Sequence, residues 1–502
     1  MELELRQQTV LSHETILEET VEQAVECDAL LPDYCPDIRR ILKCTLTPVP
    51  MGNTVTAGRL EVEGLATLNI LYISAGGEPA RGEYKVPFSR MLELHGEAEN
   101  PVISVTLRPG SVSCRAVNQR RLDIRGAVVI SAVVIACRQE KVLCGSGDET
   151  LQLKTVEKKG TRLAGAVSRE ERLGKTTVLE GAGSPLTRVL RCDAAVTRRE
   201  EKWSDGRLVV SGEVQAAAAC ANEAGGWERA VCTLPFELAL DAPEAADAVF
   251  DVRCAALSAA AELAQDDDGE YRSLDWSVTV SAWAAVYRPY TETVCTDGYS
   301  TRYQSACRSR TLQTVELSDL CRESETHRET LPRPEQTEEV VALWARPEGC
   351  QVSPEGDGLL AEGRLGLTLL TRMSDGEWYS FDRTLELQRR IPGGEDARWD
   401  AALECRGVRW EQTGGELALT CELFWQGAVR RTLRQPVLEE ITVEENRPRE
   451  DAMPRGLYIY MADEGESLWE IAKRYNTSEA RIREDNGEMG DCCPGGPLLI
   501  PV

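Results

Sequence analysis

The feature that most constrains the fold is a pattern that occurs three times along the chain. It places a glycine inside an alternating apolar segment at positions about 150 residues apart, namely Gly64, Gly212 and Gly363. A Pro-Phe pair follows the first two glycines at the same spacing, as Pro87-Phe88 and Pro235-Phe236, and is missing after the third. We therefore expect three copies of one structural unit, with the third copy the most divergent.

Apolar residues occupy every second position within each copy, over residues 60–72, 208–220 and 359–369. A period of two is typical of half-buried antiparallel strands. Turn signals rich in Gly and Asp follow each segment, at 75–79, 223–226 and 374–376, where a hairpin would reverse. A second alternating strand is expected later in each copy, at 122–134, 274–286 and 417–425. These patterns predict three tandem antiparallel β-sandwich-like units.

One helix is predicted before the first of these strands, over residues 36–42. Pro36 would occupy its first position and Asp37 its first turn, and both residue types are favourable there. Each unit would therefore begin with a short helical segment.

A different pattern ends the chain. A short alternating strand from Leu457 leads to a helix, and Ser467 and Glu470 have the spacing of a capping box at its start. A second short helix ends at Asn486, and residues 498–501 form a closing strand. The first helix has one apolar face, which consists of Leu468, Ile471, Ala472 and Tyr475. The order predicted for this small α+β module is βααβ.

Composition excludes several classes of partner. The net charge of −26 disfavours nucleic acid and anionic membranes, because phosphate binding depends on Lys and Arg. No apolar segment approaches the ~20 residues needed to cross a bilayer. The N-terminus has no basic segment followed by an apolar one, so we expect the chain to stay in the cytosol. In that compartment the 18 cysteines are expected to be free thiols rather than a disulfide framework.

Residue patterns of catalysis are not evident. The histidines His13, His95 and His327 are isolated, and no nucleophile elbow, phosphate-binding loop or zinc motif occurs. The run 266–269 resembles a calcium loop only superficially, and a hairpin tip is the simpler interpretation. We expect a protein that is not an enzyme, with no cofactor and no metal.

Three segments of the first copy resemble the SPOCS domain: residues 31–42, the strand through Gly64 that ends at Tyr72, and residues 86–88. The C-terminal module resembles LysM. SPOCS units followed by LysM resemble the SipL-like spore coat morphogenetic family, to which SpoVID is related in layout. The resemblance implies a scaffold in the mother-cell cytoplasm of a spore-forming bacterium, at the forespore surface. It also implies that the LysM region contacts the basement-layer ATPase SpoIVA and that other coat proteins are partners.

The expected domains follow from these patterns. They are an N-terminal segment (1–20), a SPOCS-type unit (21–150), two SPOCS-like units (151–303 and 304–438), an acidic linker (439–455) and the LysM module (456–502).

The expected binding site consists of the two loops that flank a shallow groove in the LysM module. Residues of the family's sugar-binding loops correspond to Gly465, Glu466, Ser467 and Leu468 in the first loop and to Asn486, Gly487, Glu488 and Met489 in the second. The second loop departs from the family pattern, and the module carries more acids than bases, which suits a basic protein partner as well as a neutral N-acetylglucosamine glycan.

Two hypotheses remain open at this point. The first is a non-enzymatic coat scaffold that docks through LysM on SpoIVA, with self-association through exposed sheet edges left open. The alternative is a peptidoglycan-binding protein of the cell wall or spore cortex.

Overall fold

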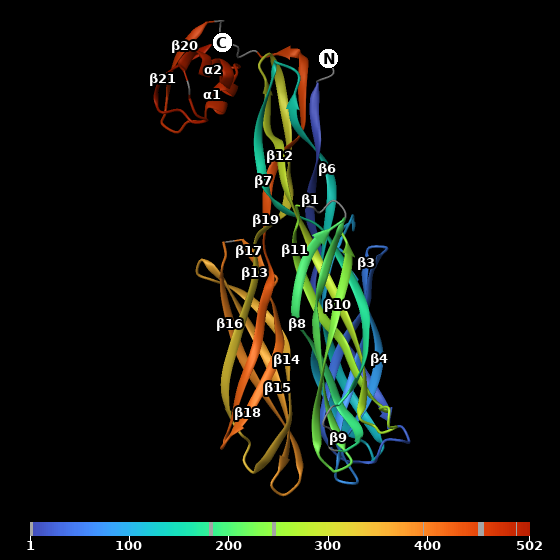
Figure 1. Cartoon of the computed structure of the whole chain (residues 1–502). Helices are drawn as coiled ribbons and strands as arrows, with labels where there is room; N and C mark the ends of the chain where they lie inside the picture. Colours follow the sequence, from blue (N-terminus) through green and yellow to red (C-terminus); the bar gives the residue numbers. More distant parts are fainter. Residues whose placement is uncertain are drawn as a thin grey trace.

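The structure is a computed structural model that describes residues 4–179, 184–242, 247–394, 396–449, 456–487 and 489–501. It is mainly β, with several antiparallel sheets and two short helices near the C-terminus (Figure 1). No helix within the described ranges is both long enough and apolar enough to cross a bilayer. All 18 cysteines are free thiols.

The first unit consists of two three-stranded sheets. One has the order β1-β6-β5, and its strands are β1 (Leu5–Leu30), β6 (Arg121–Ser146) and β5 (Val102–Ala116). The other has the order β2-β3-β4, and its strands are β2 (Ile38–Thr56), β3 (Arg59–Ser74) and β4 (Pro79–Glu93). Leu60, Leu68 and Ile70 of β3 share one buried core with Ile124 and Ile130 of β6. The alternation of the sequence therefore places every second side chain between the two sheets.

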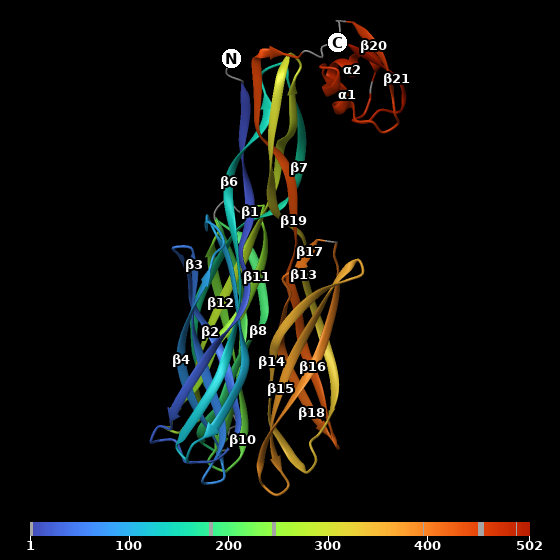
Figure 2. The same ribbon diagram turned by 180° about the vertical axis from the view of Figure 1, so that it is seen from behind.

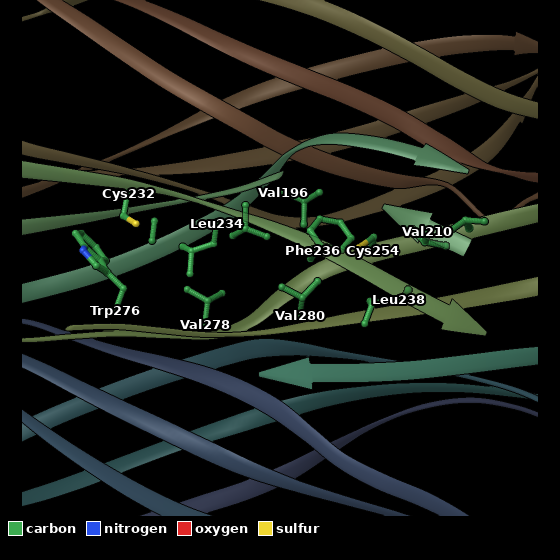
Figure 3. Close-up of a cluster of buried hydrophobic side chains, with 14 of the residues drawn as sticks. Val196, Val210, Cys232, Leu234, Phe236, Leu238, Cys254, Trp276, Val278 and Val280 are labelled. Carbon is green, nitrogen blue, oxygen red and sulfur yellow. The ribbon is translucent and has the colours of Figure 1, made fainter. Parts of the chain in front are cut away.

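The second unit repeats this arrangement. The sheet β8-β9-β10 consists of β8 (Leu186–Ser204), β9 (Arg207–Asn222) and β10 (Trp227–Asp241). It packs on β7 (Leu151–Val178), β12 (Ser273–Ser300) and β11 (Val249–Ala264). Leu234 and Phe236 of β10 point toward Val278 and Val280 of β12 (Figure 3).

The third unit has the same plan with one strand divided. Its sheet β14-β15-β16 consists of β14 (Thr337–Glu355), β15 (Gly358–Met373) and β16 (Trp378–Pro392). The facing strands are β13 (Tyr303–Pro332), β19 (Glu416–Pro448), β17 (Ala397–Trp399) and β18 (Ala402–Thr413). Strands β17 and β18 together occupy the place that β5 and β11 have in the other units.

The predicted repeat is confirmed by this topology. Residues 60–72, 208–220 and 359–369 lie in β3, β9 and β15, which are the central strands of three equivalent sheets. The later alternating strands predicted for each copy lie in β6, β12 and β19.

The helix predicted over residues 36–42 is wrong. Strand β2 begins at Ile38, and its first residues pair with the end of β3, where Ile38 faces Ser74 and Ile41 faces Tyr72. Pairing with β3 satisfies the backbone groups and places Ile38 in the core, which outweighs the local preference of Pro36 and Asp37 for a helix start.

Both segments expected to lie outside the units contain strand. Strand β1 begins at Leu5, within the expected N-terminal segment, and pairs with β6 as far as Ser146. Strand β19 continues to Pro448 and pairs with β13, so the first ten residues of the expected acidic linker are extended and hydrogen-bonded. Cross-strand pairing explains why these polar segments are ordered. Residues 450–455 of that linker lie outside the described residues.

The three units lie side by side rather than end to end (Figures 1 and 2). Outward-facing residues of the three central sheets meet in one apolar cluster, which contains Ile73, Leu190, Ala219, Ala342, Leu370 and Trp378. The ends of β1, β6, β7, β12, β13 and β19 project beyond the sandwiches (Figure 1), and we call this part the stalk. A second shared cluster runs through the stalk and contains Val10, Val142, Val294, Leu312 and Val437.

His13 connects all three units where the stalk meets the sandwiches. Its Nε2 donates a hydrogen bond to the Leu163 carbonyl at 2.8 Å, and its Nδ1 accepts one from the Val315 N–H at 3.2 Å. Burial, together with a smaller effect of the nearby Arg162 charge, lowers the pKa of His13 to about 4. The neutral imidazole is thus a structural link between units.

Candidate functional site

The C-terminal module has the βααβ order that the sequence predicts. Strand β20 (Leu457–Ala462) pairs with β21 (Gly496–Pro501), and helices α1 (Leu468–Arg474) and α2 (Glu479–Asn486) lie between them in the chain. The helices and strands bury one core, which contains Ala462, Leu468, Trp469, Ile471, Ala472, Ile482, Cys493, Leu498 and Ile500.

The capping box expected at the start of α1 does not form. Ser467 is the N-cap residue, but its side chain makes no capping hydrogen bond. The Leu468 N–H instead donates to the carbonyl of Asp491, which follows the second predicted loop, at 2.9 Å. This backbone bond satisfies the first helical N–H. Side-chain capping occurs at α2, where Ser478 accepts from the Arg481 N–H.

The first predicted loop, Gly465 to Leu468, is hydrogen-bonded along its length to residues 491–493. Gly465 N–H donates to the Cys493 carbonyl at 2.9 Å, and Cys493 N–H donates to the Glu466 carbonyl at 2.9 Å. Ser467 forms an isolated β-bridge with Cys492. These backbone groups of the first loop therefore already have partners within the module.

The carboxylate of Glu466 also has partners inside the module. It accepts a hydrogen bond from the Tyr460 hydroxyl at 2.9 Å and one from the Asp463 N–H at 3.3 Å. Arg474 of α1 forms an ion pair with it at 3.4 Å. Glu466 thus ties the first loop to β20 and α1.

Asn486 has a structural role at the end of α2. Its Nδ2 donates to the Ile482 carbonyl at 2.7 Å and to the Leu499 carbonyl at 2.6 Å, while its Oδ1 accepts from the Leu499 N–H at 2.7 Å. Gly487 and Met489 line a shallow hollow beside α2, with Ala480, Arg483, Glu484 and Gly490. Glu488, the remaining predicted site residue, lies outside the described residues.

The structure thus brings the two predicted loops together only indirectly. Residues 491–493, which the prediction omitted, form the contact with the first loop. The hollow at Gly487 and Met489 lies beside α2 and contains no residue of the first loop. A binding role for the predicted loop residues therefore stays a prediction.

Helix α1 docks on the stalk through residues that the sequence did not indicate. The indole N–H of Trp469 donates to Asp297 of β12 at 2.8 Å, and the Lys473 ammonium contacts the same carboxylate oxygen at 2.7 Å. Burial opposes the charge of Asp297, but these two hydrogen bonds outweigh it and hold the pKa of the carboxyl below its usual value.

Tyr299, two residues further along β12, belongs to the core of the module. Its ring contacts Trp469 edge-on with centroids 4.9 Å apart, and its hydroxyl donates to the Thr477 carbonyl at 2.8 Å. The side chain is 1% exposed. Because a stalk residue completes its core, the module has a fixed position at the tip of the stalk.

The opposite face of the module is exposed and apolar. Leu457, Ile459 and Met461 of β20 point outward and are 59%, 72% and 66% exposed. Their cross-strand partners on β21 are Pro501, Leu499 and Pro497, so the outer face of this small sheet carries two facing rows of apolar residues. The sheet has only these two strands, and the outer edge of β20 is therefore unpaired within the described residues.

Comparison with known families agrees with this geometry. Residues 37–117 match the SipL SPOCS domain, and residues 460–491 match the LysM domain. The chain has the SipL-like layout. The SPOCS match covers β2 to β5 of the first unit, and the LysM match covers most of the C-terminal module. No curated protein and no solved structure matches the chain.

The two matches indicate the kind of protein this is. The SPOCS domain implies a sporulation-related protein, and a LysM domain suggests glycan binding. Both domains are binding or structural modules rather than catalytic ones. Within the described ranges, no group of three or more His, Cys, Asp or Glu side chains is placed to hold a metal ion.

Proposed function

We propose that this SipL-like protein is a scaffold of the bacterial endospore coat. It would act in the mother-cell cytoplasm, at the surface of the forespore, and tether coat layers through its LysM module to the basement-layer ATPase SpoIVA. The SPOCS and LysM matches support a spore-associated binding protein, and the three side-by-side sandwiches supply a rigid body for partner contacts.

The observation that carries the proposal is the apolar outer face of β20 and β21. Sugars are held by hydrogen bonds and aromatic stacking, whereas a row of Leu457, Ile459 and Met461 favours contact with an apolar protein surface. Among the described residues no third strand joins this sheet, so a partner could also add a strand to it. Helix α1 faces the stalk, whereas the outer face of this sheet is exposed.

The test is a pull-down of purified SpoIVA by the full-length chain and by an Ile459→Asp/Met461→Asp variant. Both side chains point away from the module core, so the variant should fold normally. Met51→Asp/Met91→Asp, which changes two exposed methionines on β2 and β4, is the matched control. We expect the β20 variant to lose SpoIVA and the control to retain it. Equal retention by all three proteins would refute docking through this face.

Localisation provides a second test of the same proposal. A fluorescent fusion of the full chain should form a shell around the forespore of sporulating cells, and the β20 variant should stay diffuse in the mother cell. If the variant forms the same shell as the full chain, localisation does not depend on docking through β20.

Glycan binding is a second candidate function, supported by the LysM match and by the hollow beside α2. Ala480 is exposed and lines that hollow, so Ala480→Trp would fill it without disturbing the core. If the module binds glycan, the full chain should sediment with purified peptidoglycan and Ala480→Trp should remain in the supernatant. Sedimentation that is absent, or identical for both proteins, would count against this function.

A further inference from the structure

A cavity of about 560 Å³ lies between the first and third units. The first unit contributes Lys43 to Leu46 of β2 and Arg108 to Gly110 of β5. The third unit contributes residues of β14, β15 and β16, and Arg191 comes from β8 of the second unit. All three units therefore meet around this space, and cavities at such junctions are common ligand sites.

The cavity is basic, although the chain as a whole has a net charge of −26. Six of its lining side chains are cationic, namely Lys43, Arg108, Arg191, Arg346, Arg364 and Arg383. The acidic lining residues are Glu348 and Asp382. Lys43 forms an ion pair with Asp382, and Arg191 forms one with Asp193 at 2.6 Å.

The four other arginines, Arg108, Arg346, Arg364 and Arg383, have no ion pair within the described ranges. Arg346 Nη1 donates only to the Leu46 carbonyl at 3.0 Å and to the Thr47 hydroxyl at 3.2 Å. Burial lowers the pKa of this guanidinium, and the neighbouring Arg191 charge adds to that effect. The Arg346 guanidinium is desolvated without a carboxylate among the described residues at ion-pair distance, which is costly, and Glu348 is the one lining carboxylate outside the ion pairs given above.

We propose that this cavity binds a small multivalent anion that carries carboxylate or phosphate groups. Guanidinium groups bind both by paired hydrogen bonds, and arginines from two units could hold one ligand between them. The overall negative charge of the protein repels long polyanions, whereas a small anion can enter a locally positive cavity. The bound anion would link the first and third units.

The experiment is isothermal titration of the full-length protein with citrate and, separately, with inorganic pyrophosphate, against sodium chloride of equal ionic strength. The cavity variant is Arg364→Gln/Arg383→Gln, because both residues are exposed and Arg383 donates only to the Asp382 carbonyl. Arg90→Gln/Arg328→Gln, which replaces two exposed arginines on β4 and β13 outside the cavity, is the charge-matched control. We expect saturable binding to the wild type and to the control, and binding at least about tenfold weaker to the variant.

The two ligands distinguish the source of the anion. Saturation by citrate alone identifies a polycarboxylate site, and saturation by pyrophosphate alone identifies a phosphate site. Melting temperature provides an independent readout that a folding defect would not mimic. In chloride the variant should melt at or above the wild-type temperature, because like charges have been removed. The anion that binds should raise the melting temperature of the wild type and of the control but not that of the variant. No saturable binding of either anion, or equal affinity in variant and control, would overturn the proposal.

Discussion

The ring of Phe88 lies directly across from Gly64 on the neighbouring strand, in the space that a Cβ at residue 64 would occupy. Phe236 likewise faces Gly212 in the second unit, where the Arg198 carbonyl lies still closer to the position of a Cβ. In the third unit Leu387 faces Gly363, and Trp425 of β19 covers the glycine instead. The spacing of Gly and Pro-Phe in the sequence is therefore a cross-strand pair in which an aromatic ring covers a glycine.

Replacing Gly64 with alanine should destabilise the first unit by about 1–3 kcal/mol, because the added methyl group overlaps the Phe88 ring in a closed core. Thermal or urea unfolding of the full chain would measure the change. Gly52→Ala in β2 is the control, since an added Cβ there meets nothing within 4 Å. Equal losses of stability for Gly64→Ala and Gly52→Ala would disprove the overlap with Phe88. Adding Phe88→Leu should recover part of the Gly64→Ala loss.

Stability should depend on pH through His13. Its pKa is about 4 in the folded chain against 6.5 in the unfolded chain, so the unfolded state takes up the proton first as the pH falls. The contribution of His13 is complete above pH 6.5 and is lost between pH 6.5 and about 4. Between pH 7 and pH 5 this amounts to roughly 2 kcal/mol.

His13→Gln separates this effect from the titration of carboxylates. A glutamine amide can offer both a donor and an acceptor to Leu163 and Val315 but does not titrate. Urea unfolding at several pH values should show a shallower loss for His13→Gln than for the wild type. Parallel curves would mean that the imidazole does not titrate differently in the two states.

Asp297→Asn should loosen the C-terminal module from the stalk, because Trp469 and Lys473 lose a charged acceptor. Charge-assisted hydrogen bonds of this kind contribute about 1.5–3 kcal/mol. Hydrogen exchange at the amides of α1 in the full chain should become faster. Asp463→Asn, which removes a charge from the C-terminal module itself, should leave the exchange of these amides unchanged. If both variants accelerate the exchange equally, the cause is the change in net charge.

Thiol reactivity should follow burial. Cys492 is exposed in the second LysM loop, whereas Cys295 and Cys421 are completely buried, and burial raises the pKa of Cys421 to about 12. Brief treatment of the native chain with iodoacetamide should modify Cys492, and the two buried thiols should react only after unfolding. Mass spectrometry of peptides would identify the sites. Early modification of Cys421 would contradict the packing of the third core.

Much of the fold was predictable because it depends on local periodicity. The alternation around Gly64, Gly212 and Gly363 located the three central strands, and the helical spacing from Leu468 located α1. The helix expected at Pro36 was wrong because its signal is purely local, whereas the pairing of Ile38 with Ser74 depends on a strand more than thirty residues away. Pairing partners of this kind are not encoded in local composition.

The candidate site was less predictable for the same reason. The LysM loops could be located from their own residues, but the contacts of Trp469 with Asp297 and Tyr299 span at least 170 residues. The sequence predicted that side chains alternate between two faces along β20. Only the burial of the side chains shows that Tyr460 faces the core and Ile459 faces outward. Arg346 and Arg364 lie within one unit, and their convergence with Arg108 depends on how the units pack.

The start of β1 and the C-terminal module lie at one end of the molecule, and the loops of the sandwiches lie at the other (Figures 1 and 2). The two ends therefore carry different structural elements, and the molecule has a direction. Once the module end is immobilised, the far loops are held a full molecular length away, so whatever binds them is positioned at a defined height. If the protein is the scaffold proposed above, a chain of this shape would set the distance between two layers as well as join them.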